Sequence, residues 1–446
     1  MLSLFSVTVR ALHMRSLISP LQSVINALLN GQLVLYLGRN RVSALPVVSL
    51  AHRIGKTMRD FVNQKTKNLQ PSGIRKFFDI VSVTEGAISL GVGEPDFVTP
   101  WKVRSAAITS LQRGYTQYTG NRGMPTLLNL ISRYLEERFA LAYDPKHIIV
   151  TVGGSEAIDL ALRACVERGD EVLIPDPAYV SYSPLVLMSD GVPVHVECLE
   201  RDNFVLKPEY LEKAITPKTK ALILTYPNNP TGGIMTKSDL EAVAKIVIKH
   251  DLLVISDEIY AELTYGQKHA SIAQLPGMKE RTVYVSGFSK AFAMTGWRMG
   301  YVCAPPQIDE AMFKIHQYGI MCAPTMSQFA AIEALKDGLS DNFATVEEMR
   351  ESYDKRRKFV LYSLKEIGLD CFEPRGAFYA FPSVRSTGLN GEAFANGLLA
   401  SQKVAVVPGN AFGQFGEHNV RLSYATSMNA LSEAFDRMSK FLAQNR

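Results

Sequence analysis

The feature that most constrains the fold of this chain is a series of short apolar runs, most of them separated by helical segments. Each run has five or six residues and most are rich in β-branched side chains, which is typical of strands. Strands that alternate with helices form parallel sheets that are buried on both faces. The sequence therefore predicts an α/β fold with a seven-stranded, mostly parallel sheet between helices. The runs are 148–152, 171–175, 192–197, 221–226, 252–257, 282–286 and 300–305.

Polar and glycine residues follow most of these predicted strands directly. In sheets of this kind, ligands bind beyond the carboxyl ends of the strands, where such residues gather. The sequence thus predicts a ligand site along one edge of the sheet. The segments expected there are 153–155, 176–179, 228–232, 257–260 and 287–290.

Lys290 follows the 282–286 run after a turn of small residues, and Arg298 lies in the next turn. A lysine held at the end of a strand and removed from water can act as a nucleophile toward an aldehyde. The hypothesis is that Lys290 forms a Schiff base with pyridoxal phosphate and that Arg298 binds the phosphate. The alternative is a solvated lysine at the start of a helix.

The Gly153-Gly154-Ser155 turn lies between a predicted strand and a predicted helix at 156–166. Free N–H groups and the helix dipole at such a turn favour a bound phosphate. A turn that only joins the two elements is the alternative interpretation.

The composition excludes several classes of protein. Of the 446 residues, 47% are hydrophobic and 20% charged, which suits two packed domains. Residues 1–59 carry seven basic and no acidic side chains, which leaves 41 basic and 43 acidic residues in the remainder. We therefore expect no nucleic-acid or membrane partner. The eight histidines have no metal-ligand spacing, so no metal site is predicted, and five scattered cysteines suggest free thiols in the cytoplasm.

Four regions are expected along the chain. Residues 1–57 form an N-terminal extension, either an organelle transit peptide or a stretch upstream of the true start at Met58, which we favour. If it is a transit peptide, the location is an organelle instead of the cytoplasm. The remaining regions are an arm with part of the small domain (58–105), a large domain (106–335) and a smaller α+β domain (336–446).

Several motifs together resemble those of the class I/II aminotransferases, which are fold-type I enzymes dependent on pyridoxal 5'-phosphate. The most specific is SGFSKAFAMTGWRMGY (286–301), and NNPTGG, SDEIY and NVRLSYA are consistent with it. The resemblance extends from about Gly73 to the C-terminus. GVGEPDFVTP, GYTQYTGNRG and SGIRKF are most similar to a bacterial subgroup of aromatic and N-acetyl-LL-diaminopimelate aminotransferases.

The resemblance implies a catalytic role for Lys290, which carries the cofactor and then moves the substrate proton. Asp257 is expected to pair with the pyridinium nitrogen and keep it protonated, so that the ring accepts electrons. Arg421 is expected to bind the substrate α-carboxylate, with backbone contact from Gly93. The remaining cofactor-binding positions implied are Asn229 and Tyr260 at the phenolic oxygen, Tyr179 stacked on the ring, and Gly154, Ser155, Ser289 and Arg298 at the phosphate.

Tyr118 resembles a tyrosine that reaches the phosphate of the neighbouring subunit, which implies a homodimer with shared active sites. The substrates implied are an L-amino acid and a 2-oxo acid such as 2-oxoglutarate. The donor is expected to be aromatic, of the N-acetyl-diaminopimelate type or aspartate-like. Many relatives have a hydroxyl residue where this chain has Gly287. No second cation for a side-chain carboxylate is evident, although Arg75 could move in as a lid.

Two other functions remain possible at this stage. The same site chemistry would suit a C–S β-lyase that acts on cystathionine-type substrates. A transcription regulator with an aminotransferase-like sensor domain would need an N-terminal DNA-binding helix pair, and residues 1–60 show no such periodicity.

Overall fold

A computed structural model describes residues 60–69 and 84–444 of the chain. The chain divides into two compact units, Met1–Asn63 and Gln64–Arg446. Of the first unit only residues 60–63 are described, so the expectations for residues 1–57 lie outside the described part. Arg75 lies outside it as well.

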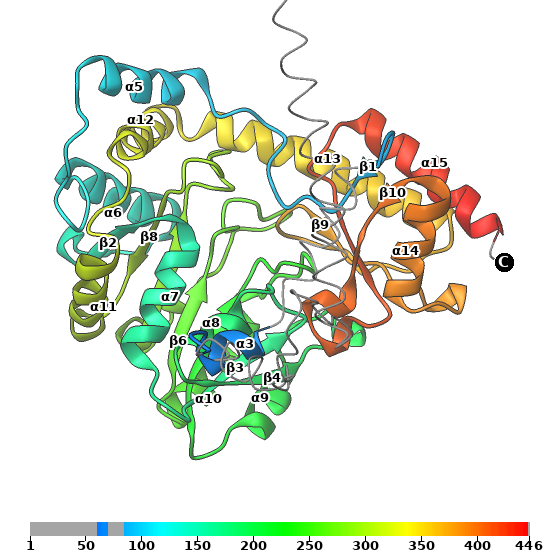
Figure 1. Cartoon of the computed structure of the whole chain (residues 1–446), viewed down its shortest axis with the longest axis horizontal. Helices are drawn as coiled ribbons and strands as arrows, with labels where there is room; N and C mark the ends of the chain where they lie inside the picture. Colours follow the sequence, from blue (N-terminus) through cyan, green and yellow to red (C-terminus); the bar gives the residue numbers. More distant parts are fainter. Residues whose placement is uncertain (1–59, 70–83, 445–446) are drawn as a thin grey trace, which may run out of the picture. The chain divides into compact units, whose positions relative to one another are not determined.

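The centre of the second unit is a seven-stranded sheet, as the sequence predicts (Figure 1). Its strand order is β2-β8-β7-β6-β5-β3-β4. Five neighbouring strands run parallel, whereas β8 is antiparallel to both β7 and β2. The strands are β2 (Ile148–Thr151), β3 (Glu171–Asp176), β4 (Val192–Glu197), β5 (Thr219–Thr225), β6 (Leu253–Asp257), β7 (Thr282–Gly287) and β8 (Gly300–Cys303).

Helices cover both faces of the sheet, because alternate strand residues point to opposite sides. On one face, Ile174, Ile255 and Val285 pack with apolar residues of α7 (Gly153–Cys165), α8 (Tyr182–Met188) and α11 (Pro306–Gly319). The other face holds two clusters. Val150 and Tyr301 pack with α5 (Trp101–Gln112), α6 (Pro125–Phe139) and α12 (Thr325–Asp341), and Leu222 and Val254 pack with α9 (Pro208–Ala214) and α10 (Lys237–Lys249).

Helix α10 shows how the sequence fixes a helix start. Thr236 Oγ1 accepts a hydrogen bond from the Asp239 backbone N–H (3.2 Å), and Asp239 Oδ2 accepts one from the Thr236 N–H (2.9 Å). This capping box satisfies two N–H groups that have no partner inside the helix. Its apolar residues Leu240, Val243 and Val247 then recur at helical spacing and face the sheet.

The C-terminal part of the unit is a smaller α+β assembly with its own core, which includes Phe378, Phe394 and Leu398. Its strands β11, β12 and β9 form an antiparallel sheet. Strand β1 from the N-terminal side of the chain pairs in parallel with β10 (Figure 1). The elements are β1 (Ile88–Ser89), α13 (Ala344–Glu366), β9 (Tyr379–Ala380), α14 (Gly391–Gln402), β10 (Val404–Ala405), β11 (Val407–Pro408), β12 (Val420–Ser423) and α15 (Met428–Gln444).

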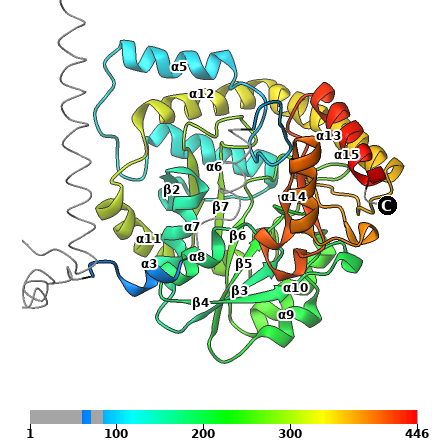
Figure 2. The ribbon, with the colours of Figure 1, turned by 45° about the vertical axis from the view of Figure 1, so that its right-hand side comes forward.

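A short helix, α3 (Gln64–Asn68), lies near α8 and the edge strand β4 (Figure 2). Lys65 Nζ forms an ion pair with Asp190 Oδ2 at 2.8 Å. Within residues 60–69 and 84–444, no helix is long and apolar enough to cross a membrane. The domain boundaries expected from the sequence stay a prediction.

Candidate active site

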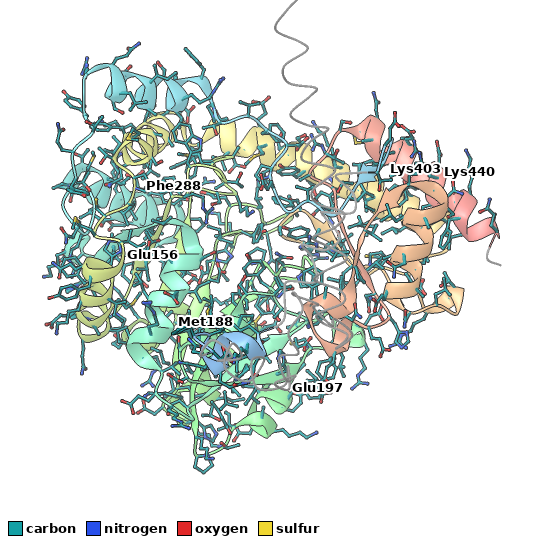
Figure 3. All side chains as sticks on the ribbon, viewed as in Figure 1. Glu156, Met188, Glu197, Phe288, Lys403 and Lys440 are labelled. Atoms are coloured by element: carbon teal, nitrogen blue, oxygen red, sulfur yellow. The ribbon has the colours of Figure 1, made fainter. Side chains whose placement is uncertain are left out.

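A cavity of about 930 Å³ lies where β5, β6 and β7 end and α7 begins. Glu156, labelled in Figure 3, marks the first turn of α7. Of the twelve site residues predicted from the sequence, eleven line this cavity. They are Gly93, Gly154, Ser155, Tyr179, Asn229, Asp257, Tyr260, Ser289, Lys290, Arg298 and Arg421.

Tyr118 is the predicted site residue that does not line the cavity of its own chain. Its side chain is 80% exposed.

Lys290 lies just beyond β7, and its Nζ donates a hydrogen bond to the backbone oxygen of Gly93 (2.6 Å). Burial lowers the pKa of Lys290 from 10.5 to about 8. Glu94 acts in the opposite direction, while Arg421 and Arg298 lower the pKa further. A buried amine beside two guanidinium groups is therefore partly neutral near physiological pH, as a nucleophile must be.

Asp257 ends β6 and is 7% exposed. Its Oδ2 accepts a hydrogen bond from the Tyr182 hydroxyl (2.8 Å), and its Oδ1 accepts one from the Ile259 N–H (3.2 Å). Burial raises the pKa of Asp257, whereas these two hydrogen bonds lower it. The carboxylate is thus available to a cationic ring nitrogen that would pair with it.

Arg298 packs against the first turn of α7. A Cβ atom placed on Gly153 (φ +74°) would lie 2.7 Å from Arg298 Nη2, so only glycine leaves room for this contact. Arg298 itself has a left-handed backbone (φ 53°), which is costly for a residue with a Cβ. Helix N–H groups and a guanidinium at one place form a site for an oxyanion such as phosphate.

Arg421 comes from β12 and is 2% exposed. Its Nη1 donates to Asn229 Oδ1 (2.8 Å) and its Nη2 to the Gly91 oxygen (2.6 Å). Nε has no hydrogen-bond partner, and the guanidinium has no carboxylate partner, within the part of the chain that the structure describes. Burial lowers the pKa of Arg421. A buried cation without a counter-ion is costly, which favours an anion binding here.

Three cavity residues were not expected from the sequence. Thr225 donates a hydrogen bond to the Tyr182 hydroxyl, which in turn donates to Asp257. The Tyr379 hydroxyl bonds to the Tyr260 hydroxyl (2.8 Å). The Tyr379 ring also lies 4.6 Å from the Arg421 guanidinium carbon. Tyr182 is the first residue of α8, and no spacing in the sequence singles out its hydroxyl.

The residues of the cavity fit pyridoxal phosphate. The oxyanion site at α7 would hold the phosphate of that cofactor, the carboxylate of Asp257 would face its ring nitrogen, and the amine of Lys290 would meet its aldehyde. Arg421 would then be left for the carboxylate of a substrate. Within the described ranges, no cluster of His, Cys, Asp and Glu could hold a metal ion.

Comparison with known proteins places this chain in a family. The family model for "Aminotransferase class I and II" matches residues 85–438. The Bacillus subtilis protein YugH is 54% identical over 386 residues, which cover 86% of this chain and 99% of YugH. An aspartate aminotransferase of Pyrococcus abyssi is 48% identical over 380 residues, 85% of this chain and 97% of that protein.

A solved structure of another aminotransferase is similar to this chain in both sequence and fold. The aromatic aminotransferase of Pyrococcus horikoshii shares 47% sequence identity, covers 83% of this chain and 99% of its own, and superposes with a TM-score of 0.79. These findings lend no support to the β-lyase alternative. The chain therefore belongs to the class I and II aminotransferases, enzymes that transfer amino groups with pyridoxal 5'-phosphate as cofactor.

Proposed function

We propose that this enzyme transfers the amino group of an aromatic L-amino acid to a 2-oxo acid such as 2-oxoglutarate in a ping-pong exchange. Donors of the N-acetyl-diaminopimelate or aspartate-like type are the alternatives. The observation that carries the proposal is Arg421, a buried guanidinium without a carboxylate partner in the same cavity as Lys290 and Asp257. A 2-oxo or 2-amino acid supplies the carboxylate that Arg421 lacks.

The individual residues have distinct roles in this proposal. When bound, the cofactor supplies an electron sink for the bond that breaks at the substrate Cα. Lys290 holds the cofactor covalently and afterwards moves the proton from the Cα. Asp257 keeps the ring nitrogen protonated. The other contacts are Asn229 and Tyr260 at the phenolic oxygen, Tyr179 against the ring, Gly154, Ser155, Ser289 and Arg298 at the phosphate, and Gly93 at the substrate.

The side-chain preference follows from the charges in the cavity. Among the described residues that line it, the cationic side chains are Lys290, Arg298 and Arg421, and each already has a proposed role. Among these described lining residues, no further cation is left for a second carboxylate, and Ile158, Val180 and Ile259 add apolar lining. The similarity to the P. horikoshii aromatic aminotransferase supports the same preference. The similarity to the P. abyssi aspartate aminotransferase keeps the dicarboxylic alternative open.

A panel of amino donors with 2-oxoglutarate as acceptor tests this preference. We expect kcat/KM for phenylalanine and tyrosine to exceed that for aspartate about tenfold or more, because an aromatic side chain gains about 1.5–3 kcal/mol from burial. A preference for aspartate would contradict the proposal. Release of pyruvate and thiol from cystathionine, without amino transfer, would indicate the β-lyase instead.

We further propose a homodimer in which Tyr118 completes the site of the partner subunit. In support, the 108–118 segment exposes several large apolar side chains, which are Ile108, Leu111, Tyr115 and Tyr118 itself. Mixing two variants tests the shared site. The variants Lys290→Ala and Tyr118→Ala are each expected to have low amino-transfer activity when assayed alone. When they are mixed and allowed to exchange subunits, activity should rise toward about a quarter of the wild-type value, since half of the dimers then contain one intact site. Activity no higher than the sum of the separate variants would contradict shared sites.

We also propose a cytoplasmic location, with an organelle as the alternative if residues 1–57 act as a transit peptide. The five cysteines are unpaired, which supports a reducing compartment.

A further inference from the structure

We propose that Tyr182 and Thr225 are positioning residues that form a hydrogen-bond relay to Asp257. The relay fixes the orientation of the Asp257 carboxylate and keeps it ionised, so that the site binds the protonated ring nitrogen of the cofactor over a wider pH range. This inference rests on the role proposed above for Asp257.

The relay is defined by three side chains from three different elements. Thr225 ends β5 and lies opposite Asp257 in the register of the parallel strands β5 and β6. Thr225 Oγ1 donates a hydrogen bond to the Tyr182 hydroxyl (2.6 Å), and the Tyr182 hydroxyl donates to Asp257 Oδ2 (2.8 Å). Because a phenol has one proton, the bond received from Thr225 commits the proton of Tyr182 to the carboxylate.

The relay donates its hydrogen bond to a carboxylate whose ionised form requires stabilisation. Asp257 is buried, and burial favours its neutral form. A hydrogen bond donated to the charged form opposes that effect, and such bonds are stronger than those between neutral groups. Burial and the nearby Asp257 hold the pKa of Tyr182 well above its ordinary value, so Tyr182 remains a donor throughout the physiological range.

Other charged groups around Asp257 cannot replace this donor. Glu258 follows it in the chain and raises its pKa, whereas Lys290 lowers it. Lys290 is proposed to bind the cofactor covalently, which removes its ammonium charge. The remaining titratable groups in the cavity are Glu94, Tyr179, Tyr260, Tyr379, Arg298 and Arg421, and none of them has a hydrogen bond to Asp257 among the contacts described.

Tyr182 also supports a second proposed contact with the cofactor. Its ring meets the Tyr179 ring edge-on, with centroids 5.5 Å apart and an interplanar angle of 78°. Tyr182 is 2% exposed, so neighbouring side chains restrict its position. A phenylalanine at this position preserves the ring contact and removes only the hydroxyl, which makes Tyr182→Phe a specific test of the relay.

The test measures the affinity of apo-protein for pyridoxal phosphate between about pH 5 and pH 9, for wild type, Tyr182→Phe, Thr225→Val and Thr225→Ser. Affinity is expected to fall at low pH as Asp257 becomes protonated. In Tyr182→Phe we expect the midpoint of this fall to rise by about one pH unit, and affinity at the wild-type midpoint to fall several-fold. Thr225→Val should also raise the pH midpoint, but by less. Thr225→Ser keeps the hydroxyl, so its midpoint should match that of wild type.

Thermal unfolding of the same four apo-proteins separates positioning from simple packing. A lower melting temperature in Tyr182→Phe or Thr225→Val with an unchanged pH midpoint would overturn the relay. If Tyr182→Phe does not fold, equal midpoints for Thr225→Val and Thr225→Ser would overturn it. Wild-type apo-protein that binds no pyridoxal phosphate at any pH would overturn the cofactor assignment, a result distinct from either of these.

Discussion

Replacement of Lys290 by alanine is expected to lower amino transfer by about 10⁴-fold or more. The variant loses both the covalent attachment of the cofactor and the base that moves the Cα proton, and a positioned base alone contributes about 10²–10⁴-fold. The measurement is kcat with phenylalanine and 2-oxoglutarate. Lys268→Ala, at an exposed lysine outside the cavity, is the matched control and should retain wild-type activity.

The position of the covalent attachment can be determined independently of turnover. Borohydride reduction of the loaded protein, followed by peptide mass spectrometry, should place the cofactor on Lys290. With a pKa of about 8, about one in ten Lys290 side chains is neutral at pH 7, against about one in three thousand at the ordinary value of 10.5. Since the neutral amine is the reactive form, the rate of attachment should rise with pH up to about 8 and then level off. A label on another side chain would refute this assignment.

Replacement of Arg421 by methionine is expected to lower kcat/KM for phenylalanine by about one hundred-fold to several thousand-fold. The substrate carboxylate would be buried without its charged partner, and such losses cost about 3–5 kcal/mol. Arg421→Lys should recover only part of this loss, because an ammonium cannot make the paired hydrogen bonds of a guanidinium. Methionine should also remove the preference for phenylalanine over phenylethylamine, which lacks the carboxylate.

The stability of the Arg421→Met protein provides a second measurement. In the ligand-free protein Arg421 is a buried cation without a counter-ion. An apolar side chain of similar length removes that cost, so the melting temperature should stay the same or rise despite the lost hydrogen bonds to Asn229 and Gly91. A protein that is strongly destabilised, or one that keeps kcat/KM within a few-fold, would show that Arg421 has a structural role instead.

The sheet and most of the site could be predicted from the sequence because both depend on local patterns. Each apolar run forms a strand, and polar residues at the strand ends meet at one edge. The sequence does not indicate that β8 runs antiparallel to its neighbours, because its apolar run is similar to those of the parallel strands. The 371–381 segment has a sequence that would suit a pair of strands, yet its one strand is at 379–380. The Arg375 and Gly376 N–H groups bond instead to the Gly232 oxygen.

The sequence did not predict three residues of the cavity, for a different reason. They are Tyr182, Thr225 and Tyr379. Their rings and methyl group suit an apolar core, so their hydroxyls carry no signal in a linear pattern. Thr225 becomes relevant only through its register opposite Asp257. Tyr379 becomes relevant only because the C-terminal assembly brings it to Tyr260. Such contacts depend on tertiary placement, which spacing along a chain does not encode.

The origin of Arg421 in β12 has a consequence for the order of synthesis. The side chains of this chain proposed to hold the cofactor all precede residue 300, whereas Arg421 is translated more than one hundred residues later and then bonds back to Asn229 and Gly91. On the ribosome, the groups for the cofactor therefore emerge well before the guanidinium proposed for the substrate carboxylate. A message cut short ahead of codon 421 would encode a polypeptide that lacks this guanidinium.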